Sequence, residues 1–239
     1  MGRVFEKRKY TIFKRNAKMA KTFTRISKDI MIACRMGIAD PALNSRLRVV
    51  IQNAKAANMP KANIDAALAR ATNKDEKDLE ELVYEGYGPY GGVAILVETA
   101  TDNPMRTVAN VRMYFTRSGG TLGKTGSLDF IFTRKAIFEI DAANRDVEAL
   151  ELELIDFGLE EIEQADDKLF LYVPFAEFGS MQKALEDKGI TVISAETIRI
   201  PNAHSESLTN EQRAEIEKLI DKMEDDDDVQ AVYHNLKED

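Results

Sequence analysis

Four basic residues repeat at helical spacing near the start of the chain. Lys18, Lys21, Arg25 and Lys28 follow one another at intervals of three, four and three, which places their charges on one face of a helix. Like charges at this spacing repel by roughly a few tenths of a kcal/mol per pair. A charged helix face is most often simply solvated, but such faces usually mix both signs and this one does not. We interpret it as a surface for nucleic acid.

Other basic residues extend this surface in the sequence. Phe5, Tyr10 and Phe13 lie among them; these rings can stack on bases, although packing on the helices is their commoner role. A second, smaller group further along consists of Arg106 and Arg117, which share a helix face with Asn110, and of Lys124. The extended surface near the start comprises Lys7, Arg8, Lys9, Lys14, Arg15, Arg46, Arg48, Lys55 and Lys61.

The charge of the whole chain is divided by position. Residues 1–75, the head, hold 17 Lys and Arg against five acids, a balance of +12, whereas the other 164 residues, the body, hold 16 basic and 36 acidic residues, a balance of −20. This division predicts that the head meets a polyanion and that the body is repelled by one.

A glycine-rich stretch, Ser118–Thr125 (SGGTLGKT), resembles a phosphate-binding P-loop. The P-loop pattern requires glycine where Ser118 stands, and it requires a strand before the loop and a helix after it. Here the expected order is helix, loop and strand. We therefore interpret the stretch as a connection, in which Lys124 and the loop amides remain free to touch a backbone phosphate.

The residues typical of catalytic and metal sites do not form a recognisable pattern. His204 and His234 are thirty positions apart with no ligand at metal spacing, and Cys34 falls on the apolar side of its predicted helix. The acids Asp225–Asp228 lack the alternating spacing of a calcium loop and are interpreted as a solvated turn. The sequence thus predicts a protein that is not an enzyme and uses no cofactor, metal or small-molecule substrate.

The elements that carry the head residues are predicted to be three amphipathic helices. Apolar residues recur at helical spacing over residues 17–35, 44–57 and 60–72, with Gly37 and Pro41 ending the first helix and Pro60 starting the third. The charged segment Asn73–Glu80 is interpreted as a linker that lets the head reorient.

The sequence pattern of the body predicts two α/β domains. Strands at Glu81–Tyr87 and Val93–Thr99 precede a helix at Pro104–Arg117, capped by Asp102 or Asn103, and a strand at Ser127–Thr133. Residues 136–199 alternate as βαββαβ, the ferredoxin-like order, and a tail adds a helix and a strand. The predicted fold class is α+β with domains at 1–75, at 81–133 plus 201–239, and at 134–200, the last inserted into the second.

Composition indicates a cytoplasmic protein. A single cysteine, Cys34, fits a reducing compartment. The first residues lack the apolar core of a secretory signal, and no stretch approaches the ~18 apolar residues that suggest a membrane span. We expect no membrane partner.

Three stretches resemble the YebC/PmpR family: Asp40–Ile64, Tyr84–Phe132 and Asp226–Asn235, supported by Lys21–Ile30. The resemblance implies a helical head followed by two α/β domains, one inserted in the other. It also implies a role among transcriptional regulators or mitochondrial translational activators. The chain departs from the family at Gly2–Phe5, where a Gly-His-Ser-Lys-Trp-like segment is usual, and at Tyr90, which looks like an insertion.

Three functions follow as alternatives. The first is a DNA-binding regulator of transcription that contacts promoter DNA. The second is a ribosome-associated translation factor that binds ribosomal RNA, favoured by a dispersed basic surface without side chains suited to reading base edges. The third is a protein-interaction module that uses the acidic body.

Overall fold

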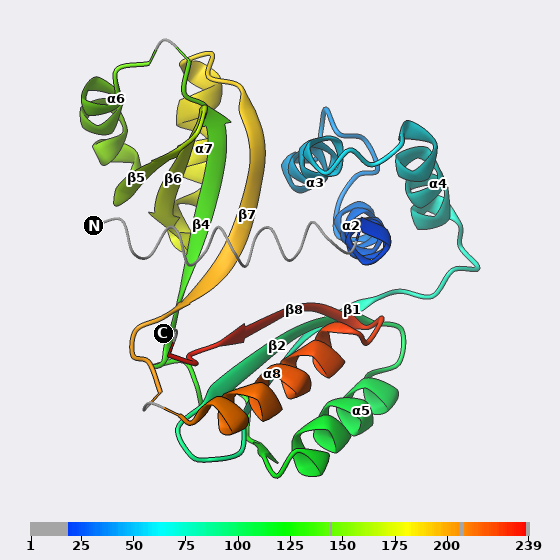
Figure 1. The fold of residues 1–239 in the computed structure, drawn as a ribbon. Helices are drawn as coiled ribbons and strands as arrows, with labels where there is room; N and C mark the ends of the chain where they lie inside the picture. The colour runs from blue at the N-terminus through cyan, green and yellow to red at the C-terminus, as the bar shows by residue number, and fades with distance from the viewer. Residues whose placement is uncertain (1–18, 144, 206–207, 238–239) are drawn as a thin grey trace. The chain divides into compact units, whose positions relative to one another are not determined.

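The computed structural model describes residues 19–143, 145–205 and 208–237. It is a mixed α+β structure, in which three helices precede two sheets of four antiparallel strands (Figure 1). The chain divides into two compact units: one combines the described part of Met1–Ala69 with Arg134–Arg199, and the other combines Arg70–Thr133 with the described part of Ile200–Asp239. The predicted fold class is confirmed.

The helices of the head lie close to where the sequence predicts them. They are α2 (Met19–Arg35), α3 (Ser45–Ala56) and α4 (Lys61–Thr72). The apolar stripe of α2 is buried at Ile26, Ile30, Ala33 and Cys34. Asn44 caps α3 by accepting a 3.0 Å hydrogen bond from the Leu47 amide, which satisfies one of the free N–H groups at the helix start.

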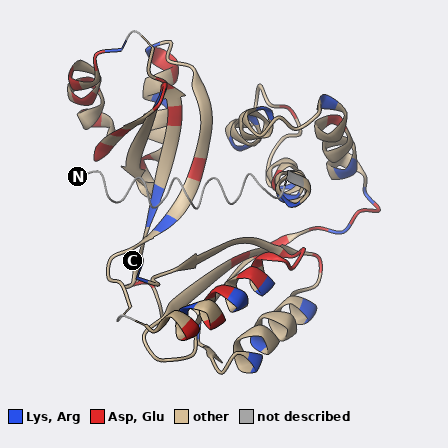
Figure 2. Cartoon of the chain, viewed as in Figure 1, with Lys and Arg blue, Asp and Glu red and all other residues tan. Residues whose placement is uncertain are grey.

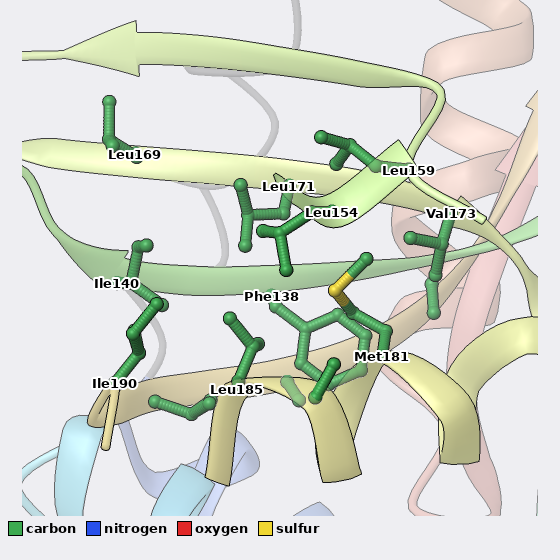
Figure 3. Close-up of a cluster of buried hydrophobic side chains, with 14 of the residues drawn as sticks. Phe138, Ile140, Leu154, Leu159, Leu169, Leu171, Val173, Met181, Leu185 and Ile190 are labelled. Atoms are coloured by element: carbon green, nitrogen blue, oxygen red, sulfur yellow. The ribbon is translucent and has the colours of Figure 1, made fainter. Parts of the chain in front are cut away.

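The inserted segment forms the ferredoxin-like sheet. Its strands and helices are β4 (Phe132–Asp141), α6 (Val147–Leu154), β5 (Glu161–Ala165), β6 (Lys168–Pro174), α7 (Phe178–Asp187) and β7 (Val192–Pro201). The hydrogen-bonded order β5-β6-β4-β7 is the one this topology produces. Figure 3 shows its core, where Phe138, Leu171 and Leu185 pack between the sheet and the helices.

Helix α3 packs directly against this inserted sheet. Val49 is buried in the same apolar cluster as Phe138. The Asn53 amide donates a 2.7 Å hydrogen bond to the Ala195 carbonyl and accepts a 2.9 Å one from the Ala195 amide in β7. The head is therefore held to a strand that lies about 140 positions away in the chain.

The second unit surrounds a highly buried strand. Its strands are β1 (Glu80–Tyr87), β2 (Ala94–Thr101), β3 (Thr121–Leu122) and β8 (Val229–His234), in the order β3-β1-β2-β8. Helices α5 (Pro104–Arg117) and α8 (Asn210–Glu224) pack on one face, where Val111, Phe115 and Leu219 are buried. Ala94 and Leu96 of β2 face a second cluster with Leu128, so this strand is covered on both sides.

The strand predicted at Ser127–Thr133 is wrong. Residues 125–131 form turns instead, and β4 starts only at Phe132. The buried Glu85 carboxylate of β1 explains the difference, because it accepts hydrogen bonds from the Gly126 amide (2.9 Å), the Leu128 amide (2.7 Å) and the Ser127 hydroxyl (3.3 Å). Three donors converging on one carboxylate require a curled backbone, which a strand cannot supply.

Candidate nucleic-acid interface

The basic stripe is only partly within the described residues. Lys7, Arg8, Lys9, Lys14, Arg15 and Lys18 lie outside them. Lys21, Arg25 and Lys28 lie on α2, and each is half-buried, whereas Ala20 and Thr24 are exposed. These three long side chains are therefore only partly accessible on α2.

The other predicted residues of the head are more open. Arg46, Lys55 and Lys61 are exposed on α3 and α4. Arg48 is half-buried, with its Nη1 atom 4.0 Å from a Glu186 carboxylate oxygen of α7. The structure thus places Arg46, Lys55 and Lys61 where a ligand can reach them and directs Arg48 toward the inserted domain.

The described part of the head that belongs to the first unit, residues 19–69, carries an excess of positive charge. Residues 19–69 hold eight Lys and Arg against three acids, Asp29, Asp40 and Asp65. In Figure 2 the blue colour that marks Lys and Arg falls on all three helices of the head. Helix α3 contains no acidic residue at all, so nothing on that helix offsets its arginines.

The second unit holds a smaller basic surface on α5. This helix also contains no acid, and Arg112 and Arg117 are exposed on it, as is Lys124 in the loop that follows. Arg112 was not among the predicted residues, although its place in an acid-free helix is visible in the sequence. These positions form an exception to the negative charge of the body.

Arg106, predicted as a nucleic-acid contact, is bonded to two carboxylates. Its Nη2 atom lies 2.7 Å from Asp228 Oδ2 and 2.8 Å from Asp102 Oδ1. The hydrogen bond from Arg106 lowers the pKa of the Asp102 carboxyl. The guanidinium remains partly open to solvent, with 47% of the side chain exposed, and its charge is largely neutralised by these acids.

The interpretation of Asp225–Asp228 as a solvated turn is wrong for two of its residues. Asp228 is 6% exposed and also accepts hydrogen bonds from the Thr101 and Thr107 hydroxyls, at 3.2 and 2.9 Å. Asp226 accepts from the Asn110 amide (3.1 Å) and the Tyr114 hydroxyl (2.9 Å). The acids therefore fasten the start of β8 to α5 and to the end of β2.

Tyr114 responds electrostatically to this arrangement. Burial and then the hydrogen bond to Asp226 raise the pKa of its hydroxyl to about 12. The phenolic hydroxyl thus stays protonated and donates to the Asp226 carboxylate throughout the physiological pH range.

The glycines of the stretch Ser118–Thr125 let two backbone segments approach each other closely. Helix α5 precedes this stretch, and the short strand β3 lies within it, so a strand comes after the helix as expected for a connection. A Cβ on Gly120 would lie 2.4 Å from the Tyr87 carbonyl oxygen, and one on Gly86 would lie 2.5 Å from the Thr121 carbonyl oxygen. Glycine is needed because two backbone segments touch here.

Neither a reactive thiol nor a cluster of metal ligands is present in the described residues. Burial raises the pKa of the Cys34 thiol, which makes it a poor nucleophile. Across residues 19–143, 145–205 and 208–237, no group of three His, Cys, Asp or Glu side chains is placed to hold a metal ion. None of the helices described is long and apolar enough to cross a membrane.

Similar proteins cover the chain from end to end. Residues 3–74 match a family model described as the TACO1/YebC protein N-terminal domain, and residues 79–236 match one described as the TACO1/YebC second and third domain. A Cytophaga hutchinsonii protein is 59% identical over 100% of this chain and 99% of its own length. One from Myxococcus xanthus is 48% identical over 99% of this chain and 100% of its own. Both carry the name "Probable transcriptional regulatory protein".

A solved structure shares the fold. A conserved hypothetical protein from Aquifex aeolicus is 34% identical, with a TM-score of 0.76, over 92% of this chain and 91% of that one. The names of the relatives describe regulatory proteins rather than enzymes.

Proposed function

Because this chain belongs to the TACO1/YebC family, the family its sequence resembles, we propose that it is a non-enzymatic, nucleic-acid-binding regulator of gene expression in the cytoplasm. Its head contacts the phosphate backbone. The observation that carries this proposal is the balance of eight basic residues against three acids in residues 19–69. A phosphate backbone is the polyanion that such a field attracts most strongly.

The proposed contacts combine the described basic residues of the head with a minor group in the second unit. The exposed side chains Arg46, Lys55 and Lys61 make the first contacts, and the ends of Lys21, Arg25 and Lys28 add to them. Arg117 and Lys124 provide a secondary surface. Contacts of this kind position a nucleic acid without reading its sequence.

The salt dependence of binding tests this function. We expect the logarithm of the association constant for duplex DNA or structured RNA to fall linearly with the logarithm of salt concentration, by about 0.7 to 0.9 per phosphate neutralised. Fluorescence anisotropy of the full chain with labelled duplexes measures the slope. Binding that does not change with salt contradicts a phosphate-contacting head.

A second candidate is a translation factor that binds ribosomal RNA on the ribosome. One observation favours it: Asn53, an amide side chain on α3 of the kind that reads adenine, instead directs its amide nitrogen and its amide oxygen to the backbone of Ala195. Recognition by shape and phosphate is typical of structured RNA. Sequencing the nucleic acid crosslinked to the protein in cells separates the two, since promoter DNA supports the regulator of transcription and ribosomal RNA supports the translation factor.

A further inference from the structure

The loop between α2 and α3 exposes three large apolar side chains. Met36, Ile38 and Leu43 are 71%, 58% and 70% exposed. Of the nine large hydrophobic residues that are exposed within the described ranges, three fall in this stretch of eight. Exposed apolar side chains are ordinary when scattered singly, whereas several gathered on one segment are typical of an interaction site.

The backbone of this loop is firmly built. Asn44 Nδ2 donates to the carbonyl oxygens of Ala33 (2.8 Å) and Ile38 (2.9 Å), in addition to capping α3. The Asp40 carboxylate accepts from the Ala42 amide at 2.9 Å. A Cβ on Gly37 would approach Asn44 Nδ2 to 2.8 Å, so the loop also closes tightly at that point. The apolar side chains are thus presented by a fixed scaffold.

Positive charge flanks the loop on both sides. Arg35 ends α2, and Arg46 lies in the first turn of α3, with its Nη1 atom 3.0 Å from the Met36 sulfur. Asp40 is the single acid between Arg35 and Arg48. A partner that fits this surface offers an apolar face beside negative charge.

We propose that the loop is a wedge that packs against unpaired or unstacked bases while Arg35 and Arg46 contact the phosphates on either side. This proposal rests on the proposed function and names the kind of nucleic acid that the head prefers. Aliphatic side chains such as Met, Ile and Leu are the residues that wedge between bases, and bases that are splayed out of a helix offer the faces they need. The side chains of Asn44 and Asp40 make hydrogen bonds within the loop. The wedge therefore offers a base apolar contact, which does not distinguish one base from another.

Two RNA hairpins of equal length test the wedge, one fully paired and one with a single bulged 2-aminopurine. We expect the full chain to bind the bulged hairpin more tightly, by roughly five-fold or more, because the apolar surface that the bulged base and the loop bury against each other contributes to affinity. The fluorescence of the 2-aminopurine should change on binding. An Ile38→Ser, Leu43→Ser double variant should lose this preference and the fluorescence change, while its affinity for the paired hairpin stays within about two-fold, since the phosphate contacts remain.

A matched control uses exposed apolar residues at the end of α6 and just after it. Leu152 and Ile155 are 75% and 53% exposed, and the Leu152→Ser, Ile155→Ser variant should behave like the unchanged protein. Urea unfolding of both variants checks that the fold is kept. Absence of a bulge preference in the unchanged protein, or its persistence in the loop variant, overturns the wedge. If the loop variant keeps the preference for the bulged hairpin but no longer crosslinks to a protein that the unchanged chain crosslinks to, the wedge is overturned and the loop is a protein-docking surface.

These outcomes are separate from failure of the proposed function. If binding of the paired hairpin depends on salt but the bulged hairpin is not preferred, the proposal of a phosphate-contacting head stands and only the wedge is rejected. Salt-independent binding of both hairpins removes both.

Discussion

Asp228 shows how one buried carboxylate ties together residues that are distant in the sequence. It joins β8 to Thr101, Arg106 and Thr107, which lie more than 120 positions earlier. Its neighbour Asp227 is exposed. Two adjacent aspartates in a run of four therefore differ completely in their structural roles.

Replacing this carboxylate by an amide should destabilise the fold. Asp228→Asn turns one acceptor oxygen into a donor that faces a guanidinium and two hydroxyls, so we expect a loss of about 1–3 kcal/mol in the free energy of unfolding. Urea unfolding measures the loss. Asp227→Asn is the control and should change stability by less than ~0.5 kcal/mol. Equal effects of the two substitutions contradict the bonding described.

Tyr114 predicts a loss of stability at alkaline pH. Its pKa is raised to about 12 in the folded protein from 10.0 for an unperturbed tyrosine, so the folded state holds this proton more tightly than the unfolded state. The stabilisation is fully present below pH 10 and is lost as pH rises from 10 to about 12. We expect unfolding midpoints in urea to fall more steeply between pH 10 and about 12 in the unchanged protein than in Tyr114→Phe. Parallel slopes contradict the shift.

Among the elements, the connection from α5 to β3 is set by close backbone contact. Gly120→Ala should destabilise the protein by about 1–3 kcal/mol, because its Cβ would meet the Tyr87 carbonyl oxygen at 2.4 Å. Gly179→Ala is the matched control: no atom lies within 4 Å of the added Cβ, and α7 gains a better helix former. Thermal unfolding compares the two, and a stable Gly120→Ala protein contradicts the close approach.

Local signals were sufficient to predict most of the elements. Asn103 followed by Pro104 gave the start of α5, and the Asn103 side chain accepts the Arg106 amide at 3.1 Å as a cap should. Apolar periodicity located α2, α3 and the whole βαββαβ segment. In each case the signal lies within the element itself.

The failures share a physical cause, which is bonding between distant residues. Residues 127–133 have strand-like composition, but Glu85, more than 40 positions away, accepts hydrogen bonds from the Gly126 and Leu128 amides and holds this backbone in a turn. Asp226 and Asp228 look solvated until α5 brings Asn110, Tyr114 and Arg106 beside them. The exposed wedge of Met36, Ile38 and Leu43 was also missed, since exposure is a property of the fold.

For the whole molecule, the head is a less independent part than its charge suggests. The domain boundaries at 1–75, at 81–133 with 201–239, and at 134–200 stay a prediction. Helix α3 buries Val49 in the inserted domain and bonds Asn53 to β7. A fragment of residues 1–75 would expose that contact, so the division of labour between head and body is better tested in the full chain.

Neutralising either basic surface in the full chain measures how much of the nucleic-acid affinity comes from the head and how much from the body. The head variant Arg46→Gln, Lys55→Gln, Lys61→Gln should lower affinity by roughly ten-fold or more and reduce the salt slope by about two to three. The body variant Arg112→Gln, Arg117→Gln, Lys124→Gln removes the same charge and should have a smaller effect, because the body as a whole carries a net negative charge that repels phosphate. A body variant with the larger loss contradicts the assignment of the interface to the head.

The position of β8 in the sheet has a consequence for how the protein is synthesised. Strand β2 pairs with β1 on one edge and with β8 on the other, yet the ribosome makes all of residues 134–200 between β2 and β8. During that interval the apolar edge from Ile95 to Thr99 has no strand to pair with. Unpaired apolar edges recruit other chains, so the nascent protein passes through a period of exposure to aggregation that ends only when β8 emerges.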